Sequence, residues 1–191
     1  LKPNGKLRFC INLKRVNKYT QAPYNNLPQI NQMLSQLNGK HIFSRLDLKD
    51  GYWQIPLSQD TNWITAFIYK GQVYKCDVLP FGLNTAPMIF QEIMRNIFSG
   101  IPNIMIYLDD ILIASEDEAT HIKDVQQVLQ RVNDYHMILN LKKCVFATTN
   151  IDILGFHVDH HGIAMQQRQT DRLPQLKAAS TIKELRALLG F

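Results

Sequence analysis

The sequence has no run of apolar residues long enough to cross a bilayer, and no signal-peptide pattern opens it. We therefore expect no membrane partner. Cysteine is scarce: Cys10, Cys76 and Cys144 lie far apart, are odd in number and form no Cys-x-x-Cys pair. Such isolated thiols favour a reducing compartment, in which they stay free and mostly pack in a core. Internal repeats, low-complexity tracts and flexible linkers are missing as well.

Charge is also limited, with 19% charged residues against 46% hydrophobic residues in a chain of 191. This balance is typical of a globular protein, and the length suggests one domain or one domain and a small piece of another. The net charge of +5 permits a polyanion partner, although a solubilising surface charge explains it equally well. The chain begins at Leu1 and stops at Phe191 inside a helical pattern, so we expect it to be part of a longer protein.

Hydrophobic periodicity predicts a mixture of helices and strands. Alternation from Leu7 to Leu13 predicts a half-buried strand with Lys6 and Arg8 on its polar face. Further strands are expected at residues 42–48, at 63–69 and 72–78 around a Lys70-Gly71 turn, at 104–114, and at 153–158 before a turn at 159–162. Helices are expected from Pro28 to Gly39, from residues 84–85 to Gly100, at 116–136 on a buried stripe of Ile122, Val125, Leu129 and Val132, and from Thr181. This order predicts an α+β fold, with helices covering one side of an antiparallel sheet.

One local pattern is less ordinary: two adjacent acids, Asp109 and Asp110, lie between two apolar, β-prone runs. They predict a hairpin whose tight turn is made of the acids. Alone, such a turn is more often a plain solvated turn, because Asp is common there. Both strands look buried, however, and carboxylates held near a core repel each other unless they share a proton or a cation. Mg²⁺ is the natural cation, since it prefers carboxylates together with phosphate oxygens.

A third acid, Asp47, ends the strand expected at residues 42–48. Three carboxylates from two sheet elements could then converge at one edge of the sheet, as two-metal phosphoryl transfer requires. Lys6 and Arg8 would neutralise a triphosphate, and Tyr52 would sense the 2′ position of the sugar. The plainer alternatives are strand-end acids, surface cations and a core aromatic ring.

Three histidines near a glycine turn, His157, His160 and His161, suggest a zinc site. Without cysteine or carboxylate partners, a polar hairpin is the commoner explanation for such a cluster.

The motifs, taken in series, resemble the fingers and palm of a reverse transcriptase. They are similar to the polymerase of gypsy-type long-terminal-repeat retrotransposons and their retroviral relatives, and the resemblance covers nearly the whole chain. It rests on the segments Leu7–Lys18, Leu46–Pro56, Leu79–Pro87, Tyr107–Asp110, Lys142-Lys143 and Leu154–Phe156. Retroviral enzymes usually carry Gln where this chain has Phe81; Phe fits the gypsy-type branch.

The resemblance implies an RNA-directed DNA polymerase that uses two Mg²⁺ ions, with Mn²⁺ as an alternative. It implies that Asp47, Asp109 and Asp110 are the catalytic, metal-binding acids, with Leu48 as a further metal ligand and Lys143 as a proton donor to the leaving group. It also implies a nucleotide site of Lys6, Arg8, Asp50, Gly51, Tyr52, Phe81 and Gly82, with Tyr52 as the gate against ribonucleotides. A second triphosphate-binding lysine would fall on Lys2, and a primer grip would fall on Leu154, Gly155 and Phe156.

In domain terms the resemblance implies partial fingers at 1–21 and 55–85, a palm at 22–54 and 86–162, and the truncated start of a thumb at 163–191. The expected partners are an RNA or DNA template with its primer, dNTPs, and the ribonuclease H, integrase and protease regions of a Pol polyprotein outside this chain. The expected location is a cytoplasmic virus-like particle or replication complex, or the nucleus.

Two alternatives to an active reverse transcriptase stay open. One is a catalytically silent nucleic-acid-binding or assembly module, a truncated or domesticated copy of the same fold. The other is an RNA polymerase of related palm architecture, which the bulky Tyr52 disfavours because such enzymes need room for the 2′-hydroxyl.

Overall fold

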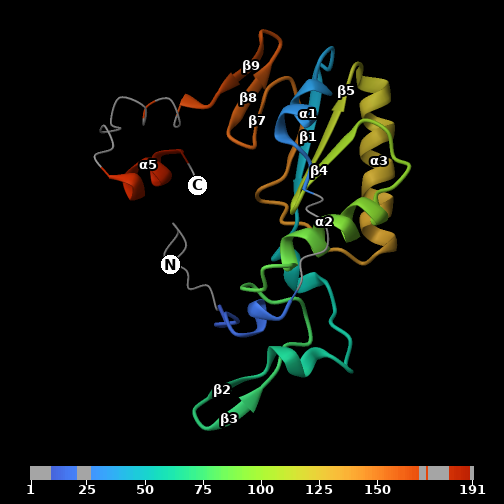
Figure 1. Cartoon of the computed structure of the whole chain (residues 1–191). Coiled ribbons are helices and arrows are strands. Elements are labelled where there is room, and N and C mark those ends of the chain that lie inside the picture. Colours follow the sequence, from blue (N-terminus) through green and yellow to red (C-terminus); the bar gives the residue numbers. More distant parts are fainter. Residues whose placement is uncertain (1–9, 21–26, 168–170, 172–180, 190–191) are drawn as a thin grey trace. The chain divides into compact units, whose positions relative to one another are not determined.

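The computed structural model describes residues 10–20, 27–167, 171 and 181–189 (Figure 1). The chain divides into two compact units, Leu1–Thr148 and Thr149–Phe191, and each is described by itself. Among the described helices, none is long and apolar enough to cross a membrane.

A four-stranded antiparallel sheet forms the centre of the first unit. Its strands are β1 (Ile42–Asp47), β4 (Ile104–Tyr107), β5 (Asp110–Ser115) and β6 (Val145–Thr148), in the order β4-β5-β1-β6. In the central pair, the register runs from Ile42 opposite Ser115 to Asp47 opposite Asp110. The strands expected at residues 42–48 and 104–114 are therefore confirmed, and they are neighbours.

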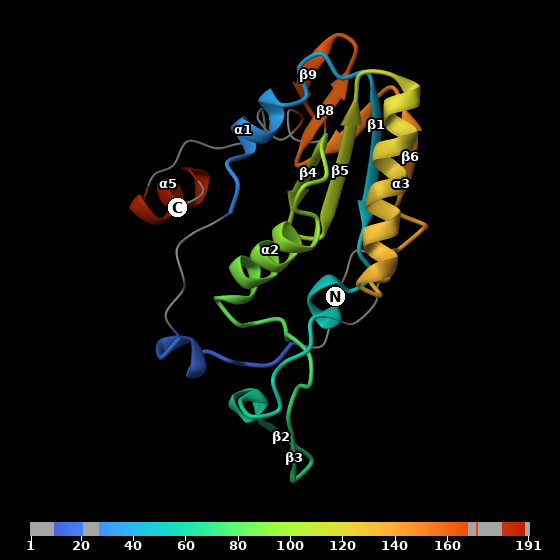
Figure 2. The same cartoon turned by 90° about the vertical axis from the view of Figure 1, so that its right-hand side faces the viewer.

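Two helices pack on one face of this sheet, α2 (Ala86–Ile97) and α3 (Glu118–Asp134), as Figure 2 shows. Because side chains alternate along a strand, Leu46 and Ile111 point to the same face. They share one buried cluster with Phe90 of α2 and Val128 of α3, and all four are fully buried. The expected one-sided helical cover is confirmed, and truncating a ring such as Phe90 to Ala would cost about 3–5 kcal/mol.

The buried face of α3 differs from the expected stripe. Val132 is buried, but Ile122 is 51% exposed and Leu129 is 38% exposed. His121 and Asp124 take the inward positions instead. An apolar periodicity cannot identify this face, because polar side chains that are fully hydrogen-bonded inside a protein pack as core residues do.

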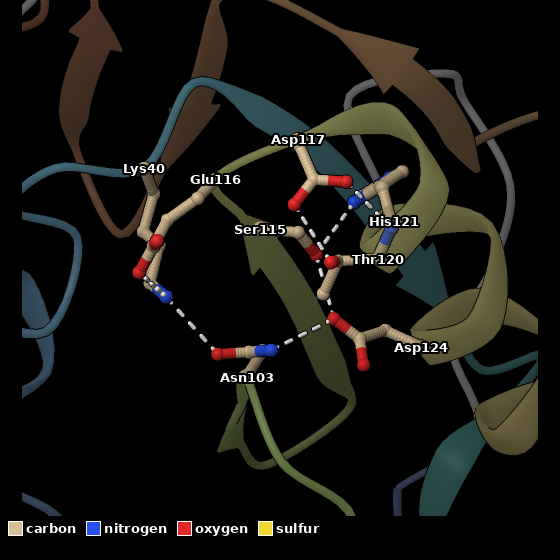
Figure 3. Close-up of polar contacts among 8 residues, drawn as sticks. All are labelled: Lys40, Asn103, Ser115, Glu116, Asp117, Thr120, His121 and Asp124. Carbon is tan, nitrogen blue, oxygen red and sulfur yellow. Dashed lines mark hydrogen bonds and ion pairs between the residues drawn. The ribbon is translucent and has the colours of Figure 1, made fainter.

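The partners of these inward residues form a buried polar network at the end of the sheet opposite Asp110 (Figure 3). Asp124 accepts hydrogen bonds from Ser115 Oγ (2.7 Å) and from Asn103 Nδ2 (2.9 Å). Because the Ser115 hydroxyl proton goes to Asp124, Ser115 Oγ must accept from His121 Nδ1, 3.0 Å away. His121 Nε2 is then free to accept from Ser44 Oγ at 2.7 Å. The chain of bonds ties α3 to β1 and β5.

The strand expected over residues 7–13 is not formed where the structure describes it. Residues 10–13 have no strand structure and lead into a 3-10 helix, Val16–Lys18; residues 7–9 lie outside the described part. Ile11 instead places its carbonyl oxygen against Gly82, and Leu13 is buried. The alternation of apolar and polar residues predicted a strand paired in a sheet. Residues 10–13 instead pack against the loop that contains Gly82.

The remaining elements of the first unit follow the expected order with shorter bounds. They are α1 (Ile30–Ser35), the 3-10 helices Gly51–Gln54 and Asn62–Thr65, and the hairpin strands β2 (Phe67–Tyr69) and β3 (Gln72–Tyr74). The turn at Lys70-Gly71 is confirmed. The expected strand at 63–69 was too long, because Asn62 turns inward to bond Asp77 and Lys75 and starts a helical turn. Similarly, α1 begins after Gln29 and not at Pro28.

The second unit contains a three-stranded antiparallel meander and a helix. The strands are β7 (Ile151–Ile153), β8 (Phe156–Asp159) and β9 (Gly162–Met165), followed by α5 (Ile182–Leu189). The run expected as one strand at 153–158 is broken by a turn at Leu154-Gly155, where both residues have positive φ. The turn at 159–162 is confirmed, as is the cap of α5, where the Glu184 N–H donates to Thr181 Oγ.

Candidate active site

The turn between β4 and β5 differs in composition from the expected one. Tyr107 pairs with Asp110, so the turn consists of Leu108 and Asp109, while Asp110 is the first residue of β5. Leu108 has φ +53°, in the left-handed region that side chains with a Cβ rarely adopt. The two acids therefore differ in environment: Asp109 is exposed at the tip, and Asp110 is half-buried in the sheet.

Asp47 meets this turn through the register of the sheet. It is the last residue of β1, lies opposite Asp110, and is 9% exposed. The N–H of the next residue, Leu48, donates to the carbonyl oxygen of Asp109 at 3.2 Å. The three predicted catalytic acids and Leu48 thus come together at one end of β1 and β5.

The charges at this end of the sheet affect one another. The pKa of Asp110 is raised, first by burial and then by the negative charges of Asp109 and Asp47; Arg45 and Lys143 act in the opposite direction. Lys143 Nζ lies 2.9 Å and 3.2 Å from the two carboxylate oxygens of Asp47. The lysine side chain is 62% exposed, so water weakens this ion pair.

The segment that carries Lys143 is also bonded to the backbone of Asp47. The Asn140 N–H donates to the Asp47 carbonyl oxygen at 2.8 Å, and the Asp47 N–H contacts Cys144 Sγ at 3.5 Å. These backbone contacts hold the lysine segment beside Asp47 independently of the ion pair.

The donor types at this site fit a divalent metal, because carboxylate oxygens are the ligands that Mg²⁺ prefers. Burial raises the pKa of Asp110 most, and the negative charges of Asp109 and Asp47 add to it; a cation between the carboxylates would relieve this repulsion. Across the described residues, no group of three or more His, Cys, Asp or Glu side chains has the arrangement of a metal site. The metal assignment therefore stays a prediction.

Several residues predicted to bind the nucleotide lie against the acid turn. Gly51 is buried, and a Cβ added there would be 3.2 Å from Asp109 Cβ and 3.4 Å from Phe90 Cζ. Asp50, just before it, has φ +54°. The Tyr52 ring packs 5.1 Å from the ring of Phe81. Burial, and then the charge of Asp109, raise the pKa of the Tyr52 hydroxyl.

The loop before α2 is fixed by contacts with the N-terminal segment. Gly82 has φ +108°, and a Cβ there would lie 2.8 Å from the carbonyl oxygen of Ile11, so only glycine fits. Asn17 Nδ2 donates to the Gly82 carbonyl oxygen at 2.8 Å, and the Asn84 N–H donates to Asn17 Oδ1 at 3.0 Å. The bridging role of Asn17 was not predicted, and a polar residue in a loop offers no signal for it.

Other predicted residues are not brought to this site by the described structure. Lys2, Lys6 and Arg8 lie outside the described residues. The predicted primer grip forms the β7–β8 turn of the second unit, which is described only by itself. In that unit His157 Nδ1 lies 2.7 Å from Asp152, as in a polar hairpin.

A comparison with protein families identifies the family to which the chain belongs. The family model described as "Reverse transcriptase (RNA-dependent DNA polymerase)" matches residues 1–158. The chain belongs to the reverse transcriptase family. The resemblance predicted from the ordered motifs is thereby confirmed.

Individual relatives agree with this family assignment. The chain is 35% identical over 191 residues to the transposon Tf2-3 polyprotein of Schizosaccharomyces pombe, covering 99% of this chain and 14% of the polyprotein. A foamy viral protease–reverse transcriptase in complex with double-stranded DNA matches with a TM-score of 0.90 and 28% identity, over 100% of this chain and 34% of that one. The same kind of protein in complex with an RNA/DNA hybrid matches with a TM-score of 0.84 and 27% identity, over 99% of this chain and 26% of that one.

These matches confirm the predicted polymerase fold of fingers and palm. They also show that the chain spans a small part of the length of its relatives. The boundaries expected between fingers, palm and thumb stay a prediction.

Proposed function

We propose that this chain forms the catalytic core of an RNA-directed DNA polymerase, which extends a primer on an RNA or DNA template by two-metal nucleotidyl transfer. The observation that carries the proposal is the pairing of Asp47 with Asp110, next to a turn that places Asp109 at the same end of the sheet. The family match and the likeness to foamy viral enzymes in complex with nucleic acid support it.

In this proposal Asp47, Asp109, Asp110 and the Leu48 carbonyl would hold two Mg²⁺ ions, and Mn²⁺ would substitute for them. When bound, such ions activate the primer hydroxyl and stabilise charge on the leaving group. The chain contributes a turn whose backbone is fixed before any ligand arrives, through the Leu48 N–H bond to Asp109. A site that is already in place loses little free energy to reorganisation during the reaction.

The nucleotide would lie beside Tyr52. Its ring is held between Phe81 and Phe90, at 5.1 Å from each ring centre. A ring packed on both sides cannot swing away, so a 2′-hydroxyl would clash with it and dNTPs would be preferred. Arg8, Lys6 and Lys2 would neutralise the triphosphate, and Lys143, next to Asp47, would give a proton to the leaving pyrophosphate.

The template and primer would be bound mainly through their phosphates, as the net charge of +5 suggests. The β7–β8 turn at Leu154-Gly155-Phe156 would contact the primer. We further propose that the chain acts within a polyprotein, as its transposon relatives do, in a cytoplasmic particle or replication complex or in the nucleus.

The test is primer extension on an RNA template with dNTPs and Mg²⁺, comparing the parent with Asp109→Asn. A matched control is Asp134→Asn, an acid on the surface of α3 that accepts a hydrogen bond from Gln130. We expect the parent and the control to extend the primer and Asp109→Asn to fail. If the parent does not extend the primer, the assay is repeated with a longer chain that includes the flanking regions. A longer chain that folds and binds the template but still extends no primer would refute the polymerase function and favour a nucleic-acid-binding module.

A further inference from the structure

A buried glutamine of α2 bonds the backbone of the acid turn. The Gln91 side chain is fully buried, although glutamine side chains are mostly exposed in folded proteins. Its Nε2 donates to the carbonyl oxygen of Ile106 at 2.9 Å, and its Oε1 accepts from the N–H of Leu108 at 2.7 Å. Both ends of one carboxamide therefore hold the chain on either side of Tyr107, directly before Asp109.

The bond to Leu108 matters because of the conformation of that residue. Leu108 has φ +53°, a conformation that a leucine adopts only when its surroundings impose it. Its N–H lies inside the two-residue turn, where Tyr107 and Asp110 form the last pair of the ladder. Gln91 Oε1 supplies the acceptor for this N–H. The carboxamide thereby stabilises the left-handed residue that sets the direction in which the next side chain, Asp109, leaves the turn.

The same turn of α2 also contacts the nucleotide side of the site. Phe90, next to Gln91, packs 5.1 Å from the Tyr52 ring and close to Gly51. Gly51 in turn approaches Asp109, with 3.2 Å between an added Cβ and Asp109 Cβ. Asp109 therefore lies between a backbone fixed by Gln91 and a surface fixed by Phe90, and both supports come from one helical turn.

We propose that Gln91 is a positioning residue, whose carboxamide fixes the Leu108–Asp109 turn and so the placement of the Asp109 carboxylate for nucleotidyl transfer. The inference rests on the proposed function for its catalytic consequence. It predicts that α2 does more than pack on the sheet. One turn of this helix contacts both the Tyr52 ring and the acid turn, so a shift of the helix would move both.

The chemistry of the side chain provides a sharp test. A positioning residue here must donate and accept at once. Methionine fills a similar volume and does neither. Glutamate does both only while protonated; once ionised, it faces the Ile106 carbonyl oxygen with a negative charge. Burial raises the pKa of a carboxyl group, so a protonated glutamic acid at this position is accessible at mildly acidic pH.

The first measurement is amide hydrogen exchange at Leu108, which does not depend on activity. We expect Gln91→Met to speed this exchange at least tenfold, beyond any change common to the whole sheet. The matched control is Asn62→Leu, which removes another buried amide that both donates, to Asp77, and accepts, from Lys75. Asn62→Leu should leave the exchange of Leu108 unchanged relative to the rest of the sheet.

The second measurement is primer extension at temperatures where all variants are folded. We expect Gln91→Met to lower kcat about tenfold or more with little change in the KM for dNTP, and to raise the Mn²⁺ concentration needed for half-saturation of binding. Gln91→Glu should recover activity at acidic pH and lose it as pH rises through the raised pKa of the new carboxyl group, relative to the parent at each pH.

The outcomes separate the two proposals. Unchanged Leu108 exchange in Gln91→Met, or a kcat equal to that of the parent, would overturn the positioning role. If Gln91→Met does not fold, Gln91→Glu without any pH-dependent recovery would overturn it as well. A chain with its flanking regions restored that folds and binds the template but never extends a primer would refute the proposed function alone, because Leu108 exchange still decides whether Gln91 fixes the turn.

Discussion

Replacing Gly51 by alanine should impair catalysis while leaving the fold nearly as stable. The added Cβ would lie 3.2 Å from Asp109 Cβ and 3.4 Å from Phe90 Cζ. Phe90 is fully buried, whereas Asp109 lies at an exposed turn, so the acid is the side that gives way. Reaching ordinary contact between carbon atoms requires a shift of roughly 0.2–0.5 Å.

The size of the effect follows from this shift. A misplacement of 1 Å costs about 10²-fold in rate, so a shift of this size should lower kcat by about 3- to 10-fold. The change in stability should stay within about 1 kcal/mol, because alanine reduces the conformational freedom of the unfolded chain and offsets part of the crowding. Gly51→Val should lower kcat further, since a branched side chain crowds the same acid.

Gly100→Ala is the matched control, because it should lower the stability of the fold and leave kcat unchanged. Gly100 follows α2 with φ +81°, and nothing lies within 4 Å of an added Cβ. Alanine there costs about 1–2 kcal/mol of backbone strain, so the melting temperature should fall by several degrees while kcat stays unchanged. The assay is primer extension with melting curves, in the shortest form of the protein that extends a primer. A Gly51→Ala variant with the parent kcat would refute the view that Gly51 sets the position of Asp109.

Three further substitutions test the same description. Tyr52→Ala should admit ribonucleotides and raise their kcat/KM relative to dNTPs at least tenfold, and unchanged selectivity would rule out the gate. Asp110→Asn should abolish extension yet raise the melting temperature at pH 7 by about 1 °C, because burial and like charges raise the pKa of this acid and its ionisation costs stability. His121 is held neutral because burial lowers its pKa, so the unfolded chain binds the extra proton more readily. Stability should therefore fall as pH drops below about 6.5, by less than about 1.4 kcal/mol per pH unit, and urea midpoints of His121→Gln should depend less on pH.

The end of the sheet that carries the three acids was largely predictable because its signals are local. An acid at the end of an apolar strand and two acids between apolar runs are visible without any knowledge of pairing. The register that joins them is less local: β1 and β5 are buried along most of their length, so no alternation of buried residues marks Asp47 and Asp110 as opposite each other. What could not be predicted was which acid is in the turn: the left-handed conformation of Leu108 moves the turn back by one residue.

On the two helices that cover the sheet, the buried positions that were missed include polar side chains packed in place of apolar ones. The stripe expected on α3 counted Ile122 and Leu129 and passed over His121 and Asp124, although the latter pair is buried. Gln91 was passed over for the same reason, although it shares a helical face with Met94 and Phe98, at the spacing of three and four residues that marks one side of a helix. A hydrophobicity pattern assigns such residues to the surface, because their partners come from distant parts of the chain.

The buried polar network around Ser44 and Ser115 explains how the sheet tolerates the acids at its other end. The pair of strands β1 and β5 carries Asp47 opposite Asp110, whose pKa is raised by burial first and then by the negative charges of Asp109 and Asp47. At the other end of the same strands, Ser44 and Ser115 join a network that, within the described residues, leaves no buried side-chain nitrogen or oxygen without a partner. A satisfied network holds a single register, because a slip of one residue would turn Ser44 away from the face on which His121 lies. The polar end therefore determines the position of the acids, and unfavourable charge can persist at one end because the other end excludes alternative pairings.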